Sequence, residues 1–234
     1  MIRNSNLAGF KIPGVEEAIK ATLFADDTTA YLAEADDFAE LQQILNTWCS
    51  AAKAKFNISK TEVIPIGSKA FRAKMIQEYS SPDGWRNYPR NAKVARDGSA
   101  VRILGAYLGN NVDQEEVWER TVRKVEKAMG RWQVAHTTFE GKRHVVQMVV
   151  GSMTQFAAHV QRMPARVTKH LTKIIRDYIW DDRPVAPVAM AHLQLHPDNG
   201  GLGILDLSAR NEAIDVMWTK AYLNFGEGRA TWAF

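Results

Sequence analysis

The stretch L-F-A-D-D-T-T-A-Y-L, residues 23–32, places two adjacent aspartates between short runs of residues that favour β-strands. This pattern predicts a tight hairpin with Asp26 and Asp27 at or beside its tip. Because adjacent carboxylates repel each other, such a pair either faces solvent or binds a cation. The hairpin is therefore a candidate metal site.

Two other Asp-Asp pairs in the sequence have ordinary structural explanations. Asp36 and Asp37 precede apolar residues at helical spacing, which predicts an N-cap and a first-turn acid for a helix over about 37–54. Asp181 and Asp182 follow a helical run and precede an Arg-Pro pair, which predicts a solvated loop. Only the first pair lies between two strand-like runs.

The bulk composition indicates a folded chain with an uneven charge. Of its 234 residues 46% are hydrophobic and 24% are charged, which is typical of globular proteins. We expect an intracellular protein, nuclear or cytoplasmic, with no membrane partner, because no apolar run resembles a signal peptide or a membrane span. Residues 63–180 hold 20 Lys and Arg against 10 Asp and Glu, whereas both flanks are acidic. This excess predicts a polyanionic partner, for which nucleic acid is the usual candidate.

The order of predicted elements indicates the α+β class. The first part is predicted to hold the hairpin, the helix, a turn at Asn57, a strand E-V-I-P-I-G and a strand pair over 101–109 that pivots near Gly105. Residues 68–100 are rich in structure breakers, which predicts a long loop or a weakly structured insertion. Helices follow. We therefore divide the chain into segments 1–110, 111–180 and 181–234.

Two of the helices carry basic residues. Opposite an apolar stripe that begins at Trp118, four cations share one helix face, and we call them the basic ridge: Arg120, Lys124, Lys127 and Arg131. Glu116 and Glu119 lie four residues before Arg120 and Arg123, so an internally paired, solvated face is the alternative interpretation.

The next helix is predicted over about 140–161, with four residues facing inward: Val145, Val149, Phe156 and Val160. Lys142 and Arg143 fall in its first turn, where a cation opposes the helix dipole and a bound phosphate would offset the conflict. We therefore expect both side chains to contact nucleic acid. Two further helices are predicted, one from about Val167 to Ile179 and one over 208–223.

The chain resembles the palm and thumb of LINE-type (non-LTR) retrotransposon reverse transcriptases, most closely those of fungal elements. F-A-D-D resembles the palm motif that holds catalytic metals, and F-N-I-S-K-T-E-V-I-P-I-G resembles a palm motif with an Asn and a Lys. R-I-L-G-A-Y-L-G resembles the primer-grip hairpin. Thumb-like marks follow: F-E-G-K-R-H-V-V-Q-M-V-V-G-S-M-T-Q-F, Y-I-W-D-D and G-G-L-G-I-L-D-L-S-A-R-N-E-A-I-D-V-M-W.

The resemblance implies a partial palm over 1–110, a helical thumb over 111–180 and a short C-terminal extension over 181–234. It implies that Asp26 binds two Mg²⁺ ions with support from Asp27, that Lys60 lies near the pyrophosphate leaving group, and that Leu104 and Gly105 seat the primer end. The implied partners are an RNA template, a DNA primer and a deoxynucleoside triphosphate.

The family has a further palm aspartate upstream of this hairpin, together with fingers, whereas the 22 residues before Leu23 contain no Asp. We therefore expect a polymerase fragment that is inactive alone and has the upstream portion of the same polyprotein as a partner. The alternatives are a non-catalytic nucleic-acid-binding module and a relic of a mobile element without function.

Overall fold

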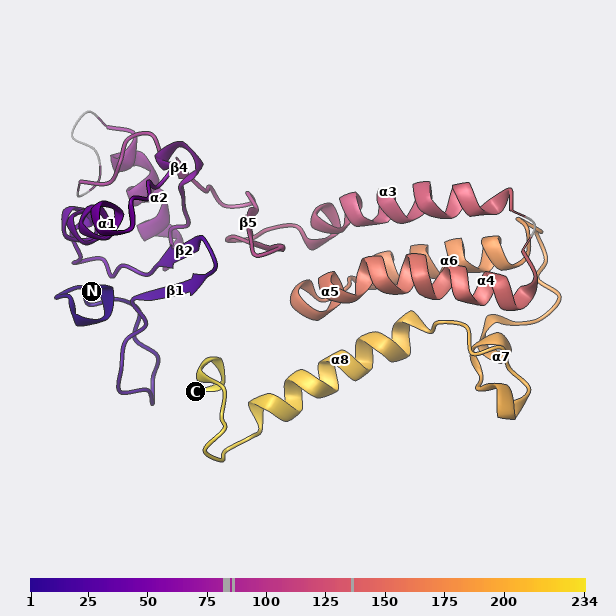
Figure 1. The fold of residues 1–234 in the computed structure, drawn as a ribbon. Helices are drawn as coiled ribbons and strands as arrows, with labels where there is room; N and C mark the ends of the chain where they lie inside the picture. The colour runs from indigo at the N-terminus through magenta and orange to yellow at the C-terminus, as the bar shows by residue number, and fades with distance from the viewer. Residues whose placement is uncertain (82–84, 86, 136) are drawn as a thin grey trace. The chain divides into compact units, whose positions relative to one another are not determined.

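The structure, a computed structural model, describes residues 1–81, 85, 87–135 and 137–234 and combines helices with two-stranded sheets (Figure 1). The predicted α+β class is confirmed at this level. The chain forms two compact units. Unit 1 comprises Met1–Leu104, Leu108–Asn111 and Ala221–Phe234, and unit 2 comprises Gly105–Tyr107 and Val112–Lys220. The division into three segments stays a prediction, but most of the third segment lies in unit 2.

Within the described residues the strands form three separate pairs. β1 (Ala21–Phe24) pairs with β2 (Asp27–Ala30) in antiparallel register, and β3 (Glu62–Val63) pairs with β4 (Lys93–Val94) in parallel. β5 (Val101–Ile103) pairs with β6 (Ala106–Leu108) through a two-residue turn. Both predicted hairpins are thus confirmed. The strand predicted over E-V-I-P-I-G is only two residues long, and Pro65 has no backbone N–H with which to extend the pairing.

The helical elements of unit 1 are mostly short. They are η1 (Ile2–Asn4), α1 (Phe38–Ala52), η2 (Ile58–Lys60), α2 (Lys69–Tyr79) and η5 (Thr231–Ala233). Of the predicted N-cap and first-turn acid, the N-cap is found: the Asp37 carboxylate accepts a hydrogen bond from the N–H of Ala39 at 2.9 Å, and the first-turn acid of α1 is Glu40. The buried apolar residues of this unit are few and include Leu7, Leu41 and Met75.

Helix α2 corrects the prediction of a loop over residues 68–100. The Ser68 hydroxyl caps this helix by accepting a hydrogen bond from the N–H of Phe71 at 3.2 Å, and the side chain of Met75, a residue of the same helix, is buried. The Tyr79 hydroxyl then donates to the carbonyl of Ala92 at 3.0 Å, which holds the end of the helix. Helix α2 was not predicted because its apolar residues form almost no stripe along one face. Three residues of the S-S-P-D-G-W stretch, 82–84, lie outside the described residues.

Unit 2 is a helical bundle around one apolar core. Its helical elements are α3 (Gln114–Gln133), α4 (Phe139–Val146), the π-turn η3 (Gln147–Gly151), α5 (Ser152–Gln161), α6 (Ala165–Ile179), α7 (Met190–Gln194), η4 (Pro197–Asn199) and α8 (Leu207–Tyr222), whose last two residues belong to unit 1. Helix α3 packs on α6 and on the continuous run from α4 to α5 (Figure 1). Trp118, Val125, Leu171 and Ile175 lie at the centre, and Leu207 of α8 joins them.

The π-turn changes which residues of the long helix face the core. A π-turn closes i→i+5 hydrogen bonds, so the helix gains one residue per turn and the following residues are rotated. Before it, Val145 and Val149 are buried as predicted, but after it Thr154 and Ala158 take the inward positions. The prediction that Phe156 faces inward is wrong: its side chain is 53% exposed.

Candidate nucleic-acid interface

The aspartate pair lies at the tip of the first hairpin. The turn between β1 and β2 consists of Ala25 and Asp26, and Ala25 adopts a left-handed φ of 52°. Asp27 begins β2 opposite Phe24. Both carboxylates are exposed, and so are the neighbouring apolar side chains Leu23 and Phe24. The hairpin presents two solvated carboxylates beside an uncovered apolar surface.

A two-metal site requires ligands that converge from separate elements onto ions about 3.5–4 Å apart. Within the described residues, no group of three or more His, Cys, Asp or Glu side chains is placed to hold a metal ion. Lys60 ends η2 with an exposed side chain and forms no hydrogen bond or ion pair with either aspartate in the described part of the chain. Asp26 and Asp27 by themselves therefore do not fit the Mg²⁺ pair that the resemblance implies.

The turn of the second hairpin is backbone-strained. Leu104 and Gly105 have φ values of 49° and 88°, and positive values at both positions are typical of the type I′ turn that suits a two-residue hairpin. Leucine rarely adopts this conformation, because its Cβ crowds the backbone. At Gly105 a Cβ would lie 2.9 Å from Cε1 of Phe156, so the turn also needs a residue without a side chain there.

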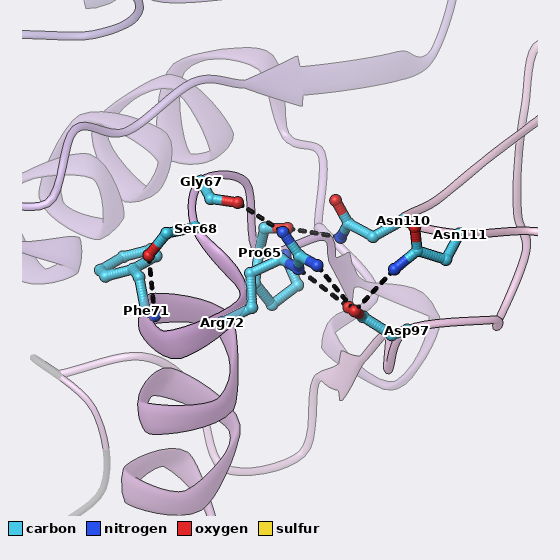
Figure 2. Close-up of polar contacts among 8 residues, drawn as sticks. All are labelled: Pro65, Gly67, Ser68, Phe71, Arg72, Asp97, Asn110 and Asn111. Carbon is cyan, nitrogen blue, oxygen red and sulfur yellow. Dashed lines mark hydrogen bonds and ion pairs between the residues drawn. The ribbon is translucent and has the colours of Figure 1, made fainter.

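Polar contacts fix both ends of this hairpin within unit 1 (Figure 2). Arg72 of α2 forms a two-pronged pair with Asp97, with Nε–Oδ1 at 2.9 Å and Nη2–Oδ2 at 2.7 Å, and its third nitrogen donates to the Gly67 carbonyl. The Asn111 amide donates to Asp97 at 3.0 Å, and the Asn110 amide donates to the carbonyl of Pro65 at 2.7 Å. Residues before β5 and after β6 are thus tied together.

The hydrogen bond and charge of Arg72 hold the pKa of Asp97 below its usual value, so the pair stays ionised near neutral pH. Arg72 and Asp97, at the centre of this network, lie inside the segment 68–100 that the sequence predicted to be a loop. One sequence signal could have predicted helix α2: Ser68 is a typical N-cap residue. An N-cap residue alone is a weak indication of a helix when no apolar stripe follows it.

The basic ridge lies on the exposed face of α3. Helix α3 begins at the N-cap Asp113, whose carboxylate accepts from the N–H of Glu115 at 2.8 Å. Trp118, Val125 and Met129 are buried in the bundle core. The four ridge cations are all exposed, and they form no ion pair with any carboxylate in the described residues: Arg120, Lys124, Lys127 and Arg131. The ridge spans eleven residue steps, or about 16 Å along the helix.

Three of the four glutamates of α3 pair with partners other than the ridge, and Glu116 forms no ion pair within the described residues. Glu119 accepts from Arg123 at 2.5 Å, one turn along the same helix. Glu115 pairs with Arg166 of α6 at 3.0 Å, and Glu126 contacts His170 of α6 at 2.8 Å. The alternative of an internally paired face thus holds for Glu119 and Arg123, whereas Glu116 and Arg120 form no ion pair within the described residues. Within the ridge, the Arg120 guanidinium donates a hydrogen bond of 3.5 Å to the hydroxyl of Tyr107, which is an uncharged partner.

Lys142 corrects a prediction. Its side chain is buried, and its ammonium donates to the Ile179 carbonyl at 3.0 Å and to the Asp181 carboxylate at 2.6 Å. It therefore caps the C-terminus of α6, where a cation is favoured by the helix dipole. A cation in the first turn of α4 is unfavourable for that helix, but Lys142 gains contacts with the C-terminal end of α6. These contacts explain its position without a bound phosphate. Asp181, predicted to be only a solvated loop residue, is its partner.

Arg143 also has an ionic partner. Its Nη2 lies 2.6 Å from Oε1 of Glu140, one turn earlier in α4. The hydrogen bond and charge of Arg143, with a smaller contribution from His144, hold the pKa of Glu140 below its usual value. The start of α4 thus already holds an ionised carboxylate beside its cations. Lys142 and Arg143 are less available to a phosphate than the ridge.

Asp36 has a structural role that sequence reasoning missed. Its side chain is only 8% exposed, and its two oxygens accept hydrogen bonds from the backbone N–H groups of Ala8 at 2.7 Å, Gly9 at 3.1 Å and Ala33 at 2.7 Å. Burial raises the pKa of this carboxyl, but the three N–H donors and the charge of Lys20 outweigh it, so the pKa is lowered. Asp36 anchors the N-terminal segment.

No model of a known protein family matches the chain. Among the residues that the structure describes, every helix is too short or too polar to cross a lipid bilayer.

Proposed function

We propose that this chain is part of an RNA-directed DNA polymerase of the non-LTR retrotransposon type, and that its helical unit binds a nucleic-acid duplex through the phosphate backbone. The observation that carries the proposal is the basic ridge of α3. Its four cations are exposed and form no ion pair in the described residues, and three of the four glutamates of the same helix pair with other groups. Phosphate contacts of this kind give affinity without sequence preference.

The dimensions of the ridge agree with this role. Its length of about 16 Å corresponds to about five nucleotides of one strand at 3.4 Å each. The order of motifs supports the polymerase family: the Asp26-Asp27 hairpin, the strained turn at Leu104 and the basic helix follow one another as the resemblance predicts. In this proposal Asp26, Asp27 and Lys60 belong to the palm, and the turn at Leu104 and Gly105 belongs to the primer grip. The activity that we assign to this chain itself is binding of a nucleic-acid duplex, because the basic ridge supports binding and no chemical step.

The test is a salt titration of binding to an RNA–DNA hybrid, followed by fluorescence anisotropy. If the ridge neutralises about four phosphates, log K falls with log salt at a slope of about −3.6, since each contact contributes about 0.9. Lys124→Ala should flatten the slope by about one unit and do so equally for hybrids of different sequence.

Lys169→Ala is the matched control. Lys169 is an exposed lysine of α6 with no ion pair among the described residues, and it lies outside the ridge. Its loss should leave the slope unchanged. A slope that does not respond to Lys124→Ala, or that responds equally to both variants, would show that the ridge does not bind phosphates.

A further inference from the structure

Helix α1 in unit 1 has an exposed face without charge. Its sequence, F-A-E-L-Q-Q-I-L-N-T-W-C-S-A-A, contains a single charged residue, Glu40 in the first turn. Helices α3 and α6 carry several charged side chains each, as is usual for helices at a protein surface. On α1, amide and hydroxyl side chains occupy the exposed positions instead, among them Gln43, Asn46 and Ser50.

A groove of about 550 Å³ lies along this face. Among the described residues that line it, none is charged or aromatic: Ala39, Gln42, Gln43, Asn46, Thr47, Ser50 and Asn87. All of them belong to α1 except Asn87. The Asn87 amide donates a hydrogen bond of 2.9 Å to the carboxylate of Asp37, the N-cap of α1, which fixes Asn87 beside the first turn of the helix.

The groove keeps hydrogen-bonding groups that are not used within the described part of the chain. The Gln42 amide donates to the Asn46 side-chain oxygen at 2.9 Å, so the Gln42 oxygen and the Asn46 NH₂ group remain available. The Gln43 side chain forms no hydrogen bond with the described residues. The Ser50 hydroxyl donates to the Asn46 backbone carbonyl at 2.9 Å, and its oxygen can still accept. Both donors and acceptors are thus presented.

The spacing of these groups matches an extended polypeptide. Gln42, Asn46 and Ser50 follow one another at intervals of four residues, so they form one row with a rise of about 6 Å between neighbours. In an extended chain, every second peptide group faces the same edge, which gives a repeat of about 6.6 Å. The distance from Ala39 to Ser50 is about 16 Å along the helix, or about five residues of extended chain.

The chemistry of the lining favours the same ligand. A side-chain amide has a C=O and an NH₂ group side by side, so it can accept from a backbone N–H and donate to a backbone C=O. An anion would find no cation among the lining residues, and a flat or aliphatic ligand would find no apolar wall beyond Ala39. The edge of an extended peptide needs neither.

We infer that this groove binds an extended segment of a partner protein through the peptide backbone, with little dependence on the side chains of that segment. Backbone hydrogen bonds provide the affinity, as they do when a peptide adds to the edge of a sheet, but a row of side-chain amides replaces the edge strand. The inference goes beyond the proposed function and does not depend on it, because α1 belongs to unit 1 and the basic ridge to unit 2.

The experiment titrates the full chain with an uncharged peptide of about six alternating threonine and serine residues, acetylated and amidated at its ends. Side-chain NH₂ signals in NMR spectra report on the groove directly. The signals of Gln42, Gln43, Asn46 and Asn87 should shift together with one dissociation constant on the order of 1 mM, as expected for a few neutral hydrogen bonds. The signal of Gln77, an exposed amide of α2 outside the groove, should not shift.

Variants and a modified peptide provide the controls. Gln43→Ala and Asn46→Ala should each weaken binding about 2- to 10-fold, because each removes one amide from the groove. Alanine favours the helix at these exposed positions, so the fold is kept. Gln77→Ala is the matched control and should leave the dissociation constant unchanged. The same peptide with every backbone nitrogen methylated keeps its side chains but has no N–H donor, and it should not bind.

Four results would overturn the inference. The first is an absence of shifts at peptide concentrations up to about 10 mM. The second is equal binding of the methylated peptide, which would show that the backbone is not recognised. The third is an equal effect of Gln77→Ala and Asn46→Ala. The fourth is tighter binding of maltohexaose, which would assign the groove to carbohydrate. None of these results changes the salt titration, which tests the basic ridge separately.

Discussion

Replacement of Asp36 by asparagine should release the N-terminal segment of unit 1. The carboxylate accepts three backbone hydrogen bonds, one at Oδ1 from Ala8 and two at Oδ2 from Gly9 and Ala33. Asparagine has one oxygen and one NH₂ group, so in either orientation the NH₂ faces at least one N–H donor. The better orientation loses the bond to Ala8 and keeps the other two.

The expected magnitude follows from these contacts. A hydrogen bond to a charged group contributes about 1.5–3 kcal/mol, and the two that remain are weakened because the acceptor is no longer charged. We therefore expect the attachment of residues 1–20 to lose about 2–3 kcal/mol, which is about a 30- to 150-fold change in the opening equilibrium.

Amide hydrogen exchange measures this opening directly. The amides of Ala8, Gly9 and Ala33 should exchange faster by that factor in Asp36→Asn, and unit 2 should be unaffected. Glu34→Gln is the matched control, because it removes an exposed carboxylate two residues away that accepts no hydrogen bond from the described residues. Equal exchange in the two variants, or a change below about threefold in Asp36→Asn, would refute the anchoring role.

The pH dependence has a definite sign. Because the pKa of Asp36 is lowered by folding, its contribution is complete above the unfolded pKa and is lost as the pH falls through the lower, folded pKa. In wild type the added protection of these amides should therefore begin to fall below about pH 4 and continue to fall on further acidification, whereas Asp36→Asn should show no such loss. Protection that increases on acidification would contradict the argument.

Three further predictions concern the cap, the strained turn and the hairpin. Lys142→Met should lower the free energy of unfolding by about 2 kcal/mol in urea titrations, because the Ile179 carbonyl and Asp181 lose their donor; a change below about 0.5 kcal/mol would show that the cap is dispensable. Leu104→Asn should raise the free energy of unfolding by about 1 kcal/mol, because asparagine tolerates the left-handed conformation; no gain would mean that the leucine side chain makes compensating contacts. Purified chain should incorporate no more nucleotide with Mg²⁺ or Mn²⁺ than Asp26→Asn does in a primer-extension assay, and template-dependent incorporation above that level would show that the hairpin contributes to an active site.

Elements that depend on neighbouring residues could be predicted from the sequence. The two hairpins, the N-cap at Asp37 and the amphipathic α3 follow from strand propensity, capping chemistry and helical periodicity, which act over a few residues. The basic ridge was predictable for the same reason, since spacings of four, three and four place its members on one helix face. The ion pairs of α3 could not be predicted in the same way, because Glu115 and Glu126 pair with residues of α6, which are distant in the sequence.

What the sequence by itself determined, then, was the local pattern: strand and helix positions, the charge of α3 and the positions of the paired aspartates. Only the tertiary structure decided which polar groups are used internally. Lys142 caps a helix end 37 residues away, and Asp36 binds backbone groups 27 and 28 residues away. Phe156, which follows the π-turn, is exposed although helical spacing predicted it to face inward. Such contacts depend on how separate helices and loops pack, and burial makes every unpaired polar group costly, so the partner is chosen by packing and not by spacing in the sequence.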